Sequence, residues 1–257
     1  MTINSDILIS YALIFIGVMA WSVLLSGRHR IGKKFIDATT TFGGAFLFAS
    51  CFINLVPHMY LEGYTTPNLG IKVGAAALVG FMIQLLLEQM THGVEHGHNH
   101  NVCCEDHEHH PEHIHPMTGL MLGLCIHSFL EGMPMVDGEG DIHQGLLWGI
   151  ILHNIPITLV LITLMMNNRF KLGKSLLLLA VFAVMTPLGS VLGLSVMSSN
   201  ETLSCLMMGV VVGILLHVSV SILFDHDHNK FSWIKFGLIL LAFIAAYFTP
   251  GCPEIYG

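Results

Sequence analysis

Stretches of apolar residues long enough to cross a lipid bilayer fill most of this 257-residue chain. About twenty residues, at a rise of 1.5 Å per residue, carry an α-helix across the hydrocarbon core. Eight such runs predict an all-α membrane protein, a bundle of eight transmembrane helices. We expect the spans at about 7–25, 38–60, 71–90, 117–135, 145–166, 175–197, 204–224 and 234–250.

The composition agrees with a membrane protein, since 53 % of the residues are hydrophobic and only 11 % are charged. Soluble domains carry about 25 % charged residues. The first apolar run is preceded by no basic residue and followed by no small-residue cleavage site, so we expect a retained anchor and not a signal peptide. We therefore expect residues 1–257 to form a single transmembrane domain.

The lysines and arginines predict an orientation, because basic residues concentrate in cytoplasmic connections. Nine of the ten fall in the connections after spans 1, 5 and 7, and Lys72 is the exception. This asymmetry predicts that both termini lie outside and that the connection between spans 3 and 4 lies inside.

That inner connection, residues 91–116, holds nine of the seventeen histidines, two adjacent cysteines and no lysine or arginine. It lacks a periodic apolar face, so we expect a disordered cytosolic loop. Imidazole and thiolate groups at this density bind zinc-like cations, although an ordinary solvated loop is the alternative. The candidate loop ligands are His96, His98, His100, Cys103, Cys104, His107, His109, His110, His113 and His115.

Three costly side chains lie inside two consecutive spans. His127 and Glu131 are four residues apart and so share one helix face, and His153 lies in the next span. Ionisable groups in a span are costly in lipid and mark functional sites. Two imidazoles and a carboxylate at matched depth form a ligand set for zinc, iron(II) or a similar dication. A single histidine would equally suit a hydrogen bond between helices.

Other polar residues are weaker candidates. His217 in span 7 has no obvious partner in the sequence, and a gating role, a proton-linked role and a helix-to-helix hydrogen bond all stay open. The connection between spans 4 and 5 is acidic and would attract cations to an outer mouth, or it is simply a solvated loop. Its candidate residues are Asp137, Glu139, Asp141 and His143; on the inner side, 225–228 reads DHDH.

Small residues and prolines predict how the spans pack. Pairs of glycines four residues apart allow helices to approach closely in lipid. These pairs are Gly70/Gly74, Gly119/Gly123, Gly145/Gly149, Gly189/Gly193 and Gly209/Gly213. Prolines inside spans predict kinks, and we expect them at Pro57, Pro134, Pro156 and Pro187.

The motifs HSFLEG in span 4 and HNIP in span 5 resemble the paired signatures of the ZIP family of divalent-metal transporters. FLFASCFINLVPH in span 2 and TPLGSVLG in span 6 are also similar to that family. The resemblance implies a helical bundle with inverted-repeat character and uptake into the cytosol by elevator-like or rocking alternating access. It also implies that His127, Glu131 and His153 bind the transported metal at mid-membrane depth.

This chain departs from the family pattern at the second metal site that the resemblance implies. The second, neighbouring metal site of the family would draw on Ser128, Asn154, Ile157 and Thr186, none of which is a carboxylate. Two dications a few ångströms apart repel strongly unless carboxylates offset them. We therefore expect one metal per transport site. Auxiliary or second-site positions are Ser128, Asn154, Thr186, His217 and Asn54.

Together these features predict a divalent-cation transporter of the plasma membrane, with zinc as the first substrate and iron, manganese, cobalt, nickel or cadmium as others. We expect no organic cofactor and no nucleic-acid partner; membrane lipid and metal ions are the partners, and a homodimer is a candidate assembly. A membrane-bound metal sensor or buffer and a weakly transporting relative are alternatives. A histidine-box enzyme or zinc hydrolase fits less well, because the histidine clusters lie in one loop and no H-E-x-x-H motif is present.

Overall fold

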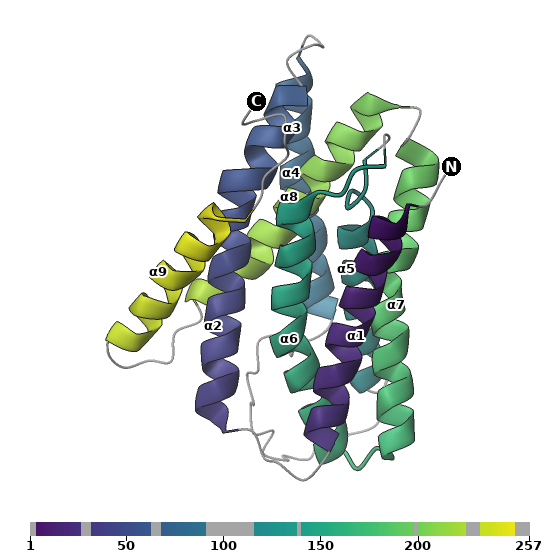
Figure 1. Cartoon of the computed structure of the whole chain (residues 1–257), viewed down its shortest axis with the longest axis vertical. Helices are drawn as coiled ribbons and strands as arrows, with labels where there is room; N and C mark the ends of the chain where they lie inside the picture. The colour runs from purple at the N-terminus through teal and green to yellow at the C-terminus, as the bar shows by residue number, and fades with distance from the viewer. Residues whose placement is uncertain are drawn as a thin grey trace, which may run out of the picture.

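The computed structural model describes residues 4–26, 32–62, 68–90, 116–137, 140–197, 200–224 and 232–249. Within these ranges the chain forms eight helical rods, most of which run along the long axis of the molecule (Figure 1). Six of them are long and apolar enough to cross a membrane, and two apolar helices are shorter. The predicted fold class, an all-α membrane bundle of eight helices, is confirmed.

One rod is built from three consecutive pieces, because a π-helical segment, η1, interrupts it. The elements are α1 (Ser5–Ser26), α2 (Lys33–Ser50), η1 (Cys51–Leu55), α3 (Val56–Glu62), α4 (Leu69–Met90), α5 (Pro116–Gly132), α6 (Gln144–Asn167), α7 (Leu172–Met197), α8 (Glu201–Phe224) and α9 (Trp233–Tyr247).

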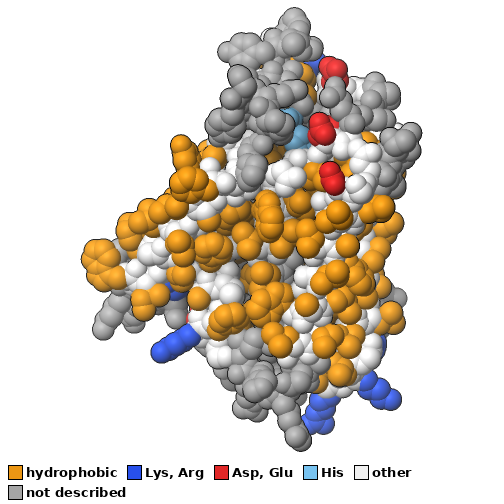
Figure 2. Space-filling model, viewed as in Figure 1, with side chains coloured by type: hydrophobic (Ala, Val, Ile, Leu, Met, Phe, Trp, Pro, Cys, Tyr) orange, Lys and Arg blue, Asp and Glu red, His pale blue; other side chains and the backbone are white. Residues whose placement is uncertain are grey.

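Apolar side chains cover the middle of the surface, as expected for helices that face lipid (Figure 2). In that view the acidic and histidine side chains gather toward the upper end of the molecule. Most of the visible lysines and arginines lie at the lower end. On this face, the described acidic side chains therefore lie mainly at one end of the bundle and the described basic ones mainly at the other.

The packing divides the rods into two groups. The first bundle contains α1, α5, α6 and α7, and the second bundle contains α2 with η1 and α3, α4, α8 and α9. The most extensive contact between the bundles joins α2 to α6. In Figure 1, α9 inclines away at the side of α2.

Glycines bring some helices into backbone contact, as their spacing predicted. A Cβ at Gly189 would collide with the carbonyl oxygen of Phe129, and one at Gly193 with that of Met133, so α7 lies directly against α5. Gly213 meets the backbone of Ala77 in the same way. Such contacts strengthen packing in lipid, where van der Waals contact replaces the hydrophobic effect between helices.

One proline prediction is wrong. Pro134 does not lie inside a helix, because α5 ends at Gly132 and the next residues form a turn. The backbone N–H of Met135 donates to the carbonyl of Gly132 over 3.1 Å, which closes that turn. Pro156 and Pro187 do lie inside α6 and α7. Pro57 follows η1, where the wider π-helical turn precedes the proline ring.

Candidate metal centre

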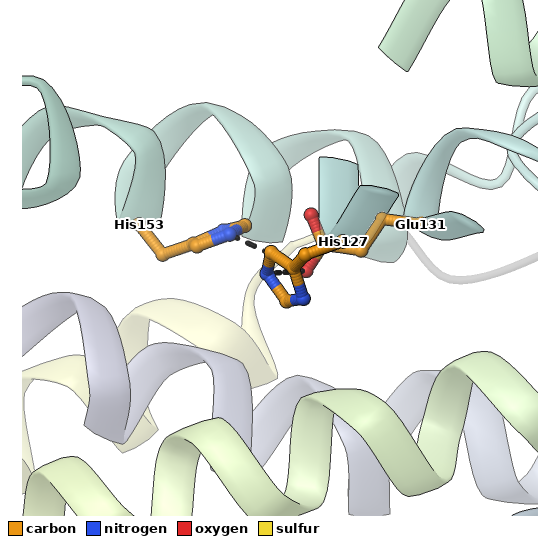
Figure 3. Close-up of side chains that lie close together, drawn as sticks. All are labelled: His127, Glu131 and His153. Atoms are coloured by element: carbon orange, nitrogen blue, oxygen red, sulfur yellow. Dashed lines mark ion pairs between the residues drawn. The ribbon is translucent and has the colours of Figure 1, made fainter. Parts of the chain in front are cut away.

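Two helices of the first bundle bring three ligand-type side chains together. His127 and Glu131 lie one turn apart on α5, and Nε2 of His127 is 3.0 Å from Oε1 of Glu131. His153 reaches the same oxygen from α6, with its Nε2 at 3.3 Å. The three side chains point toward one another in Figure 3. We call this group the triad.

The triad is shielded from solvent, and each of its members is at most 1 % exposed. Its ligand atoms all lie within 4.8 Å of one another. Among the described residues, no other group of three or more histidines, cysteines, aspartates or glutamates is this close. The three predicted transport-site residues therefore do meet in space.

Hydrogen bonds determine which nitrogen of each imidazole faces the centre. Nδ1 of His153 lies 2.9 Å from the carbonyl oxygen of Gly149, an atom that only accepts, so this Nδ1 carries a hydrogen. Nδ1 of His127 lies 3.0 Å from Oε1 of Gln84 and is also the donor. In the neutral form, each ring therefore turns an Nε2 lone pair toward Glu131.

The two Nε2 atoms and Oε1 of Glu131, all electron-rich, consequently converge at a point buried from solvent. Neither oxygen of Glu131 nor Nε2 of His153 has a hydrogen-bond partner among the described residues. Buried acceptors that face one another are costly, and either protons on the imidazoles or one dication removes that cost. Two imidazoles and one carboxylate are the ligands that zinc and neighbouring first-row dications take.

Gln84 is a site residue that the sequence analysis missed. It lies on α4 of the second bundle and is completely buried, yet it hydrogen-bonds a ligand-type residue of the first bundle. Its contact fixes the tautomer and the orientation of His127, as partners of metal-binding histidines commonly do. The available signal was a neutral polar residue inside an apolar run, GFMIQLLLEQM.

A family comparison agrees with this chemistry. The model of a family described as "ZIP Zinc transporter" matches residues 95–248, which is more than half of the chain. The chain belongs to the ZIP zinc transporter family. The resemblance noted from the HSFLEG and HNIP motifs is therefore confirmed, and membership in a family of transporters sets the enzyme alternatives aside.

A curated ZIP relative covers part of the chain. Zinc transporter ZIP1 of Plasmodium falciparum (isolate 3D7) is 32 % identical over 150 residues, which is 54 % of this chain. The match spans 41 % of the length of that relative. Both comparisons identify a multi-pass membrane protein of the ZIP family.

The positions of the expected second metal site are neutral and buried to different degrees. Ser128, Asn154 and Thr186 are at most 4 % exposed. Ile157 is partly buried and packs against an apolar cluster that includes Val18 and Leu120. No further cluster of ionisable ligands accompanies the triad within the described residues.

Asn54 and His217 do not join the triad. Nδ2 of Asn54 donates to Oγ of Ser50 at 3.3 Å. His217, for which the sequence suggested no partner, has one: its Nε2 is 3.5 Å from Oε2 of Glu88. Its ring also meets Phe81 edge-on, with the centroids 4.7 Å apart. His217 thus contacts a carboxylate of α4 from α8, and the two form an ion pair when the imidazole is protonated.

The outer-entrance residues are partly described. Asp137, Asp141 and His143 lie in the connection between α5 and α6, where Val136 and Ile142 form a β-bridge. Glu139 lies outside the described residues, as do 225–228 and all predicted metal ligands of the loop 91–116.

Proposed function

We propose that this ZIP-family chain carries a divalent cation, zinc in the first place, through a membrane by way of the triad. The observation that carries the proposal is the convergence of two Nε2 atoms on Oε1 of Glu131 in a buried place between transmembrane helices. Iron(II), manganese, cobalt, nickel and cadmium are further candidate substrates, because the same ligand set accepts them.

The proposed site holds a single metal. The only carboxylate in it is that of Glu131, and one negative charge offsets only part of the charge of one dication. Ile157, one turn after His153, packs with apolar neighbours. A second dication beside the first would therefore meet repulsion with no carboxylate to offset it.

The residues around the metal have distinct roles in this proposal. The carboxylate of Glu131 lies between the imidazoles and supplies the negative charge. Gln84 and the Gly149 carbonyl hold the Nδ1 hydrogens, so that both Nε2 atoms face Glu131, where the metal would bind. Protons that occupy the imidazoles in the empty site leave when the metal binds, and they return to Nε2 when it departs.

For the membrane arrangement, we infer a single transmembrane domain over 1–257 with both termini outside and the 91–116 loop inside. The concentration of visible lysines and arginines at one end supports this orientation (Figure 2). Close contact between α2 and α6 supports a state closed toward the acidic end. There a Cβ at Gly145 would lie 2.7 Å from Cβ of Asn54, and one at Gly149 would lie 3.0 Å from Leu47. We further infer that the membrane is the cell membrane.

Zinc uptake into proteoliposomes tests the proposal. Glu131→Gln keeps the size of the side chain and removes its charge, and we expect it to abolish uptake; His153→Ala should do the same. Glu201→Gln is the matched control, because Glu201 is an exposed acid at the start of α8. If both triad variants, correctly folded, transport zinc at the rate of the unaltered protein, the proposed function fails.

A further inference from the structure

A pair of histidines meets at the end of the molecule where α3 ends and α6 begins. The ring centroids of His58 and His143 are 4.5 Å apart, and the rings are nearly perpendicular, at 78°. His143 is only 5 % exposed. His58 belongs to the second bundle. His143 lies at the start of α6, which belongs to the first bundle, so the pair bridges the two bundles.

The backbone holds both residues in place. The N–H of His143 donates to the carbonyl of Met135 at 3.0 Å, and its own carbonyl accepts from the N–H of Leu147 at 2.9 Å. His143 therefore sits at a fixed position between the β-bridged connection and α6. On the other side, His58 lies in α3 directly after η1 and Pro57. The π-helical segment interrupts the α-helical rod three residues before His58.

A carboxylate acts on His143. The charge of Asp137 interacts favourably with protonated His143, whereas His58 disfavours that protonation. Burial is the largest effect, and it lowers the pKa of His143 to about 4. Oδ1 of Asp137 accepts from the N–H groups of Gly140 and Asp141, both at 2.8 Å, which fixes the carboxylate in its turn.

We propose that His58 and His143 form a second divalent-cation site at the mouth of the protein, with the negative charge of Asp137 in the same connection. Two imidazoles and a nearby carboxylate suit zinc, with water completing the coordination. A metal held by both rings would tie the two bundles together at this end.

This site is separate from the triad. His143 and His153 are ten residues apart, which is about 15 Å along an α-helix. Between them, Oγ of Ser50 donates to the carbonyl of Gly145 at 2.9 Å, and the glycine face of α6 lies against α2. The mouth site thus lies on the far side of the contact that closes the bundle. The binding of zinc at the mouth site does not rest on the proposed function; a role in passing zinc on to the triad would.

The test uses the full-length chain with the triad removed by Glu131→Gln and His153→Ala. The amount of bound zinc is measured after equilibrium dialysis under reducing conditions in three variants of this triad-free protein. The first keeps His58 and His143, the second carries His58→Phe and His143→Phe, and the third carries His58→Cys and His143→Cys. The phenylalanines keep an edge-on ring contact but offer no ligand. The cysteines offer ligands but no rings. Zinc held by the 91–116 loop is common to all three and cancels in the differences.

We expect the phenylalanine pair to lose about one zinc per chain and the cysteine pair to retain it, since thiolates are zinc ligands. Zinc should also raise the unfolding temperature less in the phenylalanine form than in the other two, because a ligand stabilises only the fold that binds it. Equal zinc content in the unaltered and phenylalanine forms would overturn the mouth site. That result would leave the proposed function intact, because the triad is absent from every protein compared.

Discussion

Oε1 of Gln84 lies 3.0 Å from Nδ1 of His127, although the two residues belong to different bundles. The triad itself is carried by the first bundle alone. Its environment therefore depends on how the second bundle lies against the first. Any movement of the bundles that takes Gln84 away from His127 would loosen the orientation of one ligand and weaken metal binding.

The first prediction follows from this contact. Gln84→Ala should lower zinc affinity at the triad about 10- to 100-fold, the range typical for loss of a hydrogen-bond partner of a metal ligand. Zinc binding and the concentration dependence of uptake would measure it. Gln89→Ala is the matched control, because Gln89 has the same side chain on the same helix but is exposed. If the two variants bind zinc equally well, Gln84 does not position His127.

The local part of the site could be predicted from the sequence, because helix periodicity determines it. His127 and Glu131 had to share a face of one helix, and the short connection from α5 to α6 suggested that His153 would approach them. Gln84 could not be predicted in this way. Its contact with His127 depends on how α4 packs beside α5, and no local pattern encodes that arrangement.

Two other side-chain contacts could not be predicted from the sequence, for similar reasons. His217 and Glu88 were both visible as polar residues in spans, but their pairing requires α4 and α8 to lie in backbone contact, as they do at Gly213. The contact of His58 with His143 joins two bundles, and it lies just after the π-helical segment Cys51–Leu55. The apolar pattern of span 2 is the same for α-helical and π-helical turns, so it predicts a helix without predicting this segment or the contact.

The second prediction concerns the number of metals in the triad. The protein with Glu131→Gln and His153→Ala should bind about one zinc fewer than the unaltered protein, because the second-site positions offer no carboxylate to balance another dication. Metal analysis after dialysis gives the difference, and the loop contributes equally to both proteins. A loss of two zinc ions would contradict the single-metal site.

The third prediction tests the packing that supports α5. Gly189→Ala would place a methyl group against the carbonyl oxygen of Phe129, so α5 and α7 must separate. Overpacking of this kind costs about 1–3 kcal/mol, and the displaced α5 carries two members of the triad. We expect a lower unfolding temperature and weaker zinc binding. Gly17→Ala on α1 is the control, because a Cβ there meets nothing within 4 Å.

The fourth prediction is a pH dependence. The pKa of His143 is lowered from 6.5 to about 4 by burial and by His58, with Asp137 acting in the opposite direction. Between these two values the unfolded chain binds a proton that the folded chain does not. Stability should therefore fall as the pH decreases from 6.5 to 4, by up to about 1.4 kcal/mol per unit for this one group.

Thermal unfolding in the presence of a chelator, measured across that range, checks this dependence without bound metal. His143→Asn removes the titrating group but keeps a polar side chain of similar size, so its stability should fall less steeply between pH 6.5 and 4 than that of the unaltered protein. Above pH 6.5 both states of His143 are neutral, and the two slopes should agree. Parallel curves throughout the range would mean that His143 is protonated as readily in the folded chain as in the unfolded one.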